Sequence, residues 1–260
     1  MLILAYHRVN PEVRDGLSVS PEMLRLQLTS LLERGWRNVV LEEALASGRV
    51  DSADKSFAVT FDDGYQDNYL HGVSILESLG VRATVYLVSD MIDSPDPFPW
   101  LVSDSGPVDA EDLHMTSVQI LDALAKGLFV YGSHTRTHPF LSTLDEKEAR
   151  AEIRDSKTEL EDLLGVEVTT FCYPAGDFKA ETVEYVREAG YRAAVVTPNR
   201  HIPETMFTLH RVGVYSHATP RLFRTKTNSL YLQAQRRKAF WWARRRRVAN
   251  RQLSRSDQHT

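Results

Sequence analysis

The chain has 260 residues, of which 42% are hydrophobic and 25% charged, a composition typical of globular proteins and unlike that of disordered or collagen-like chains. Its one cysteine excludes an intramolecular disulfide and a cysteine-based zinc site, so a metal would need histidine and carboxylate ligands. We find no apolar run of about 18 residues and no signal-like start, so we expect a cytoplasmic protein without a transmembrane helix.

Charge is distributed unevenly around the net value of −4. The residues after Gln235 carry a net charge of +8, whereas residues 1–235 carry −12. The basic segment also contains Trp241 and Trp242, and cations with aromatic rings suit an anionic membrane surface. We therefore expect either peripheral contact with the inner membrane through residues 236–255 or a tail without fixed structure. The acidic body argues against a nucleic-acid partner.

Strands and helices alternate along the first half of the chain. Leu2–Tyr6 reads as a short buried strand that ends at His7. Ser20 and Pro21 are typical of a helix start, and leucines at helical spacing continue to Gly35. The same criteria predict, in order, a strand at 36–41, a helix at 41–48, a strand at 56–61, a helix at 68–79 and a strand at 81–88.

The second half begins with a proline-rich loop at 91–113. The predicted elements that follow are a helix at 117–125, a strand at 129–132, a helix at 144–164, a strand at 168–173, a helix at 180–189 and strands at 191–197 and 211–215. Regular alternation of this kind predicts an α/β fold with a parallel sheet, open or closed. We divide the chain into a folded domain, residues 1–220, and a basic, aromatic-containing tail, residues 221–260.

Polar side chains stand where the predicted strands end. Asp62 and Asp63 follow the strand at 56–61, and His134 and His138 follow the strand at 129–132. His7 follows the first strand. Because functional residues of parallel α/β folds gather at the carboxyl ends of the strands, we expect these side chains to share one site.

These residue types suit metal chemistry. Two adjacent carboxylates after a strand point in different directions, so one can bind a metal while the other faces a water. Histidines four residues apart lie on one face of a helical turn and can reach one ion. Two imidazoles and one carboxylate leave coordination positions for water and substrate, as a catalytic zinc site requires. The sequence therefore predicts a metal-dependent hydrolase with an aspartate as general base.

Three segments resemble those of a known family. Residues 59–64 (VTFDDG), 133–138 (SHTRTH) and 171–176 (FCYPAG) look like the first three motifs of the polysaccharide deacetylases, the NodB-homology group or carbohydrate esterase family 4. They occur in the family's order, and the similarity spans roughly residues 1–215. The resemblance implies a distorted (β/α) barrel of about seven parallel strands. It also implies a carbohydrate substrate and a divalent metal, for which we expect zinc, with cobalt, nickel, manganese or iron as alternatives.

The resemblance assigns a role to individual residues. Asp62 is similar to the catalytic base of the family. Asp63, His134 and His138 are similar to its metal ligands. Tyr173 resembles the residue whose backbone N–H helps to stabilise the oxyanion.

The family's general acid is a histidine in a late Leu-x-x-His motif. Here residues 4–7 read Leu-Ala-Tyr-His, so the pattern stands at the start of the chain. This arrangement resembles the circularly permuted subgroup that deacetylates poly-N-acetylglucosamine in biofilm systems. We assign the acid role to His7 and keep His210 as the alternative.

The motifs predict the reaction more closely than they predict the identity of the substrate. An arginine that the family often has before its Pro-Tyr motif is absent, and Ala175 stands where the biofilm subgroup commonly has an aromatic residue. Pro174, Ala175 and Trp100 are candidate substrate contacts, although Trp100 could instead pack under its loop. We expect removal of N-acetyl groups from an amino-sugar polysaccharide or a lipid-linked glycan. An O-acetyl esterase, a deformylase and an inactive carbohydrate-binding homologue remain alternatives, and the sequence does not indicate an oligomeric state.

Overall fold

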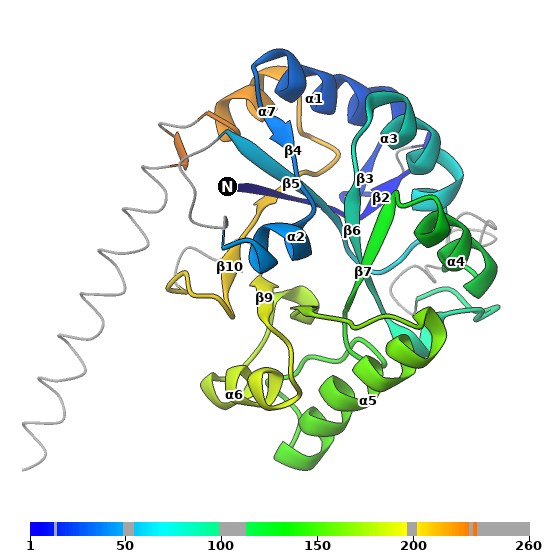
Figure 1. The fold of residues 1–260 in the computed structure, drawn as a ribbon, viewed down its shortest axis with the longest axis vertical. Coiled ribbons are helices and arrows are strands. Elements are labelled where there is room, and N and C mark those ends of the chain that lie inside the picture. Colours follow the sequence, from blue (N-terminus) through cyan, green and yellow to red (C-terminus); the bar gives the residue numbers. More distant parts are fainter. Residues whose placement is uncertain (13–14, 49–54, 99–112, 197–201, 229–230, 233–260) are drawn as a thin grey trace, which may run out of the picture.

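A parallel sheet with helices outside it forms the body of the protein (Figure 1). The computed structural model describes residues 1–12, 15–48, 55–98, 113–196, 202–228 and 231–232. The strands of the main sheet are β1 (Leu2–Tyr6), β4 (Arg37–Asn38), β5 (Ser56–Phe61), β6 (Ala83–Leu87), β7 (Phe129–Ser133), β8 (Thr170–Cys172), β9 (Ala193–Val196), β10 (Leu209–His210) and β11 (Val212–Gly213). They follow the order β10-β9-β8-β7-β6-β5-β1-β11, and β4 pairs with β5. Every pairing is parallel, so the predicted distorted (β/α) barrel is confirmed.

Helices connect the strands, and most of them cover the outside of the barrel, whereas α2 packs against its interior (Figure 1). They are α1 (Pro21–Glu33), α2 (Leu41–Ala46), α3 (Val73–Leu79), α4 (Ser117–Ala125), α5 (Glu146–Leu164), α6 (Ala180–Glu188) and α7 (Pro220–Lys226). The longest, α5, begins at a reciprocal capping box of Asp145 and Glu148 and ends at Gly165, whose φ of 66° is left-handed. Among the described residues, no helix is both long enough and apolar enough to span a membrane.

One short stretch brings the two ends of the sheet path together. Leu209 and His210 pair with β9, and Val212 and Gly213, only one residue further on, pair with β1. The chain therefore passes directly from one edge of the sheet path to the other, which nearly closes the barrel. Arg211 lies at this junction and is buried.

Side chains alternate between the outside and the inside of the barrel, as the period of a strand requires. One apolar cluster packs between sheet and helices and includes Leu2, Leu4, Phe57, Val59 and Phe61. A second cluster fills the interior and includes Ile3, Ala58, Tyr86, Cys172 and Val195, with Leu41 and Ala44 from α2. The interior is tight, since a Cβ on Gly132 would come within 2.5 Å of the Tyr86 ring.

Several predicted elements differ in extent from those observed. The strand predicted at 36–41 contributes only β4, because α2 begins at Leu41. The helix predicted from residue 68 opens with a π-helical turn, Asn68–Gly72, before α3. The strand predicted at 211–215 is reduced to β11, and β10 was not predicted. A separate two-stranded sheet of β2 (Arg8–Val9) and β3 (Ser18–Val19) was also missed.

The folded body extends past the predicted boundary at residue 220. Helix α7 begins at Pro220, its Phe223 side chain is buried, and Arg34 of the C-cap of α1 donates a hydrogen bond of 2.8 Å to Thr227. Apolar burial of Phe223 anchors this helix to the domain. The segment predicted to contact membrane, residues 236–255, lies outside the described residues.

Candidate active site

Alternation along the strands places the predicted site residues at one mouth of the barrel. On β5 the side chains of Ala58 and Thr60 face inward, and Asp62 continues the series just past the strand end. Asp62 and His134 are buried, whereas His7 is partly exposed. The carboxyl ends of β1, β5 and β7 thus bring together residues that are far apart in the chain.

Asp63, His134 and His138 form a compact group of three ligand atoms. One carboxylate oxygen, Asp63 Oδ1, lies 3.4 Å from Nε2 of each histidine. Two ligands held tetrahedrally at about 2.1 Å from one zinc ion would themselves be about 3.4 Å apart. The spacing of these donors therefore fits a small divalent cation.

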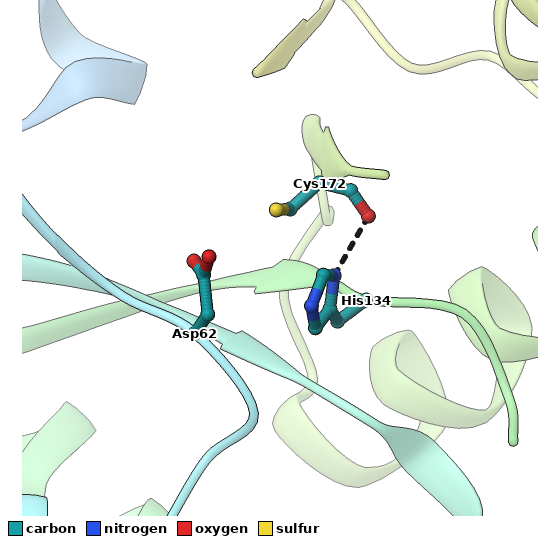
Figure 2. Close-up of side chains that lie close together, drawn as sticks. All are labelled: Asp62, His134 and Cys172. Atoms are coloured by element: carbon teal, nitrogen blue, oxygen red, sulfur yellow. Dashed lines mark hydrogen bonds between the residues drawn. The ribbon is translucent and has the colours of Figure 1, made fainter. Parts of the chain in front are cut away.

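His134 is oriented by a backbone carbonyl. Its Nδ1 lies 2.8 Å from the carbonyl oxygen of Cys172, a contact drawn in Figure 2. Because a carbonyl only accepts hydrogen bonds, Nδ1 carries a proton, and in the neutral ring Nε2 keeps its lone pair for a metal. Such contacts fix the tautomer of metal-binding histidines and are typical of real metal centres.

The segment that joins the two histidines is a bent loop, so the helical turn inferred from their spacing is wrong. Thr135 and His138 have left-handed φ values of 69° and 61°, and this bend turns the two imidazoles toward each other. Glu152 of α5 holds the loop by accepting hydrogen bonds of 2.9 Å from the backbone N–H groups of Arg136 and Thr137. Asp63 also has a left-handed φ, 72°, so strained backbone is concentrated at this site.

Asp62 is held by an arginine that the sequence analysis did not single out. Arg211 donates to both carboxylate oxygens, at 2.6 and 2.7 Å, and also to Thr60 Oγ1 at 2.9 Å. Burial alone would raise the pKa of Asp62, but the charge and hydrogen bonds of Arg211 lower it below its usual value. Asp62 is therefore ionised at neutral pH.

His7 also lies close to the Asp62 carboxylate. Its Nε2 lies 3.7 Å from Asp62 Oδ2. No such contact with Asp62 is found for His210 among the described residues, so the geometry favours His7 of the two candidate acids. The backbone of His7 is fixed by Asn68, whose Nδ2 donates 2.9 Å to the His7 carbonyl.

A buried ion pair next to His7 strengthens this attachment. The Asp67 carboxylate accepts from Arg8 Nε at 3.0 Å, from the Val9 backbone N–H at 3.1 Å and from Asn68 Nδ2 at 2.8 Å. Asp67 and Asn68 belong to the segment that follows Asp62, so the loops that carry the candidate base and the candidate acid are bound to each other.

Comparison with known proteins identifies the family of this chain. The family model of the polysaccharide deacetylases matches residues 49–194. The chain belongs to the polysaccharide deacetylase family. The resemblance inferred from the three motifs is confirmed, and the family is one of hydrolases that act on carbohydrates.

Individual relatives of this polysaccharide deacetylase are distant. The YxkH protein of Bacillus subtilis (strain 168), named provisionally as a polysaccharide deacetylase, is 26% identical over 216 residues, 82% of this chain and 70% of that protein. The structure of IcaB from Ammonifex degensii is 24% identical and superposes with a TM-score of 0.69, covering 89% of this chain and 96% of that one. A Streptococcus pyogenes deacetylase, PplD, solved with acetate, is 22% identical with a TM-score of 0.71, covering 88% and 98%. At these identities the structural matches establish the fold.

A second group of potential ligands in the deacetylase consists of Asp62, His134 and Cys172, which Figure 2 shows converging from three strands. This group is poorly suited to a cation. Both oxygens of Asp62 are engaged by Arg211, which also donates to Cys172 Sγ at 3.2 Å, and burial raises the pKa of the thiol. The group formed by Asp63 is therefore the candidate metal centre.

The residues predicted to stabilise the oxyanion or to contact substrate differ in their exposure and hydrogen bonding. The Tyr173 backbone N–H, predicted as the oxyanion donor, already has a partner, the Val195 carbonyl at 3.4 Å. Pro174 is buried, whereas Ala175 is exposed and has a left-handed φ of 52°. Trp100 lies outside the described residues.

Next to the candidate metal ligands lies a group of aromatic rings that the sequence analysis did not identify. The His114 side chain is buried and packs edge to face on Phe98, with ring centroids 4.1 Å apart. Phe98 in turn contacts the His138 ring, with centroids 5.8 Å apart, and Tyr65 stacks on His114. Burial lowers the pKa of His114 to about 4, so its ring is neutral at neutral pH.

Proposed function

We propose that this polysaccharide deacetylase is a metal-dependent N-deacetylase that acts on an amino-sugar-containing glycan. The proposal is supported above all by one arrangement: an ionised Asp62 lies between a three-ligand metal centre and an imidazole that can serve as an acid. Binding of a carbohydrate alone would require neither a base nor an acid at these positions.

The metal centre would consist of Asp63, His134 and His138. The 3.4 Å spacing of their ligand atoms and the fixed tautomer of His134 support this choice. A bound divalent cation would supply Lewis acidity, which lowers the pKa of water toward about 7 and polarises an acyl oxygen. Three protein ligands leave open positions for both groups.

Asp62 acts as the general base in this proposal. Arg211 keeps its carboxylate ionised and aims it, so it can accept a proton from the attacking water. The amide of Ala175, which has no hydrogen-bond partner within the described part of the chain, is proposed as the oxyanion donor in place of the engaged Tyr173 amide. One such donor is worth about 3 kcal/mol.

His7 donates a proton to the departing nitrogen. An amine is a poor leaving group without protonation, whereas the alcohol of an ester needs it less. The placement of His7 Nε2 at 3.7 Å from Asp62 therefore favours an N-acyl over an O-acyl substrate.

The test measures metal content and acetate release from N-acetylglucosamine oligomers for the full chain, two site variants and one control variant. Asp63→Asn is expected to lose both bound metal and turnover. Asp62→Asn is expected to keep the metal and lose about 10²- to 10⁴-fold in rate, the usual contribution of a general base. Asp155→Asn, on the outer helix α5, is the matched control and should behave like the unmodified chain.

Either of two results would contradict the proposal. A near-normal rate for Asp62→Asn would remove the base assignment. Full metal content in Asp63→Asn would remove the metal centre, provided that circular dichroism finds both variants folded.

A further inference from the structure

The side of the site that carries His7 continues outward through two more aromatic rings. The His7 and Tyr215 rings are stacked with centroids 6.1 Å apart and an interplanar angle of 28°. Tyr215 and His217 are stacked in turn, at 5.9 Å and 15°. Tyr215 is half-buried and His217 is exposed, so the three rings lead from the candidate acid to the surface.

The position of the Tyr215 ring depends on a glycine. A Cβ on Gly213 would lie 2.7 to 2.9 Å from Tyr215 ring and hydroxyl atoms, so the ring lies directly over this residue. Gly213 pairs with Ala5 of β1, the strand that ends at His7. Burial raises the pKa of the Tyr215 phenol, and the nearby Asp62 charge raises it further. The phenol is therefore neutral and able to donate a hydrogen bond.

The order of the strands separates the two halves of an N-acyl substrate. Asp62 follows β5, and the histidine ligands follow β7 on one side of it. His7 follows β1 and Tyr215 follows β11, both on the other side. The acyl group belongs with the metal centre, and the nitrogen that receives a proton belongs with His7. The sugar attached to that nitrogen therefore lies on the β1–β11 side.

We propose that Tyr215 and His217 form the wall of a subsite for the sugar ring that bears the released amine. Stacked, partly exposed aromatic rings present a flat apolar surface to the C–H face of a sugar, and the Tyr215 hydroxyl adds a hydrogen-bond donor for a sugar hydroxyl. This inference rests on the proposed function for the identity of the substrate. It adds two residues that none of the three sequence motifs contains.

The experiment measures sugar binding separately from turnover. The metal-stripped full chain is titrated calorimetrically with the tetramer of N-acetylglucosamine, and kcat and KM for acetate release are measured on the metal-loaded protein. His217→Ala and Tyr215→Phe are each expected to raise Kd and KM by about 3- to 10-fold, the size of one stacking contact or one hydrogen bond. Tyr185→Phe, a half-buried tyrosine that stacks on Arg150 far from the β1–β11 side, is the matched control and should retain wild-type values.

The outcomes separate this inference from the proposed function. Unchanged Kd and KM in both variants would overturn the subsite, as would a wild-type chain that does not bind the tetramer. A Tyr215→Phe variant with reduced kcat and unchanged Kd would mean that Tyr215 serves His7 instead of the sugar, and would also overturn it. Sugar binding that weakens in both variants, with no acetate released by wild type, would support the subsite and refute the proposed function.

Discussion

Replacing Arg211 tests the electrostatic design of the candidate active site most directly. Its guanidinium makes two charge-assisted hydrogen bonds to the buried Asp62 carboxylate, at 2.6 and 2.7 Å. Arg211→Gln would leave this carboxylate buried without a cation, which typically costs about 3–5 kcal/mol. The same change removes the effect that outweighs burial, so the pKa of Asp62 should rise. At neutral pH the variant should therefore be less stable and lack part of its ionised base.

Two measurements check this prediction. Urea unfolding should give the loss of about 3–5 kcal/mol, and the acidic limb of the pH–rate profile should move to higher pH. Arg211→Lys keeps the charge but not the bidentate geometry, so it should fall between wild type and Arg211→Gln. Arg192→Gln breaks an exposed pair with Glu167 and should cost less than about 1 kcal/mol. An Arg211→Gln variant with the stability and acidic limb of the wild type would refute the reasoning.

Two further predictions concern groups around the site. Asp67→Asn should loosen the backbone around His7. It should then lower kcat for an N-acetyl sugar more than kcat for an aryl acetate ester, because the leaving group of the ester needs no acid. Equal losses on both substrates would argue against a role of Asp67 in positioning His7. Glu42, on the barrel-plugging helix α2, accepts hydrogen bonds from Thr84 and Thr170, and burial raises the pKa of its carboxyl above 4.5. Ionising the buried carboxyl therefore lowers the stability of the folded protein at neutral pH, whereas below the ordinary carboxyl pKa the group is protonated and this cost is absent. Glu42→Gln should accordingly raise Tm at about pH 7.5 but not at about pH 4. An unchanged Tm at both pH values would contradict the prediction.

The local sequence pattern was sufficient to predict the position of a site residue wherever a strand ended directly at that residue. The buried strand β5 ends just before Asp62, and the buried, apolar strand β1 ends just before His7, so the period of the strand fixes which way each side chain faces. Because both strands are buried and parallel, their carboxyl ends had to meet at one mouth of the barrel. The pattern therefore predicted that these side chains share one site, whereas their individual roles as base, acid and metal ligands came from the resemblance to the deacetylase motifs.

The residues that tune the site could not be predicted in this way. Arg211 is 149 positions away from Asp62 in the chain, and its strands β10 and β11 have two residues each, too few for a periodic pattern. Glu152 lies on the amphipathic helix α5, where a glutamate is unremarkable in sequence, yet it holds the loop between His134 and His138. The Arg211 contact forms only when the barrel closes, and the Glu152 contact forms only when α5 packs beside the loop that follows β7.

The two adjacent aspartates are chemically identical, and the different roles that we propose for them rest on their different surroundings. Alternation along β5 turns Asp62 into the barrel, where the Arg211 guanidinium engages both of its oxygens and its positive charge disfavours a metal cation there. Asp63 has a left-handed backbone and directs one oxygen to His134 and His138; burial alone would raise its pKa, but the two imidazoles lower it well below the usual range. In the proposed mechanism the arginine therefore does more than keep the base ionised, because its positive charge beside one carboxylate would leave the other to hold the metal. In that mechanism Arg211, the residue that joins the two edges of the barrel, determines which aspartate serves as base, and its bond to Asp62 depends on the closure of the sheet.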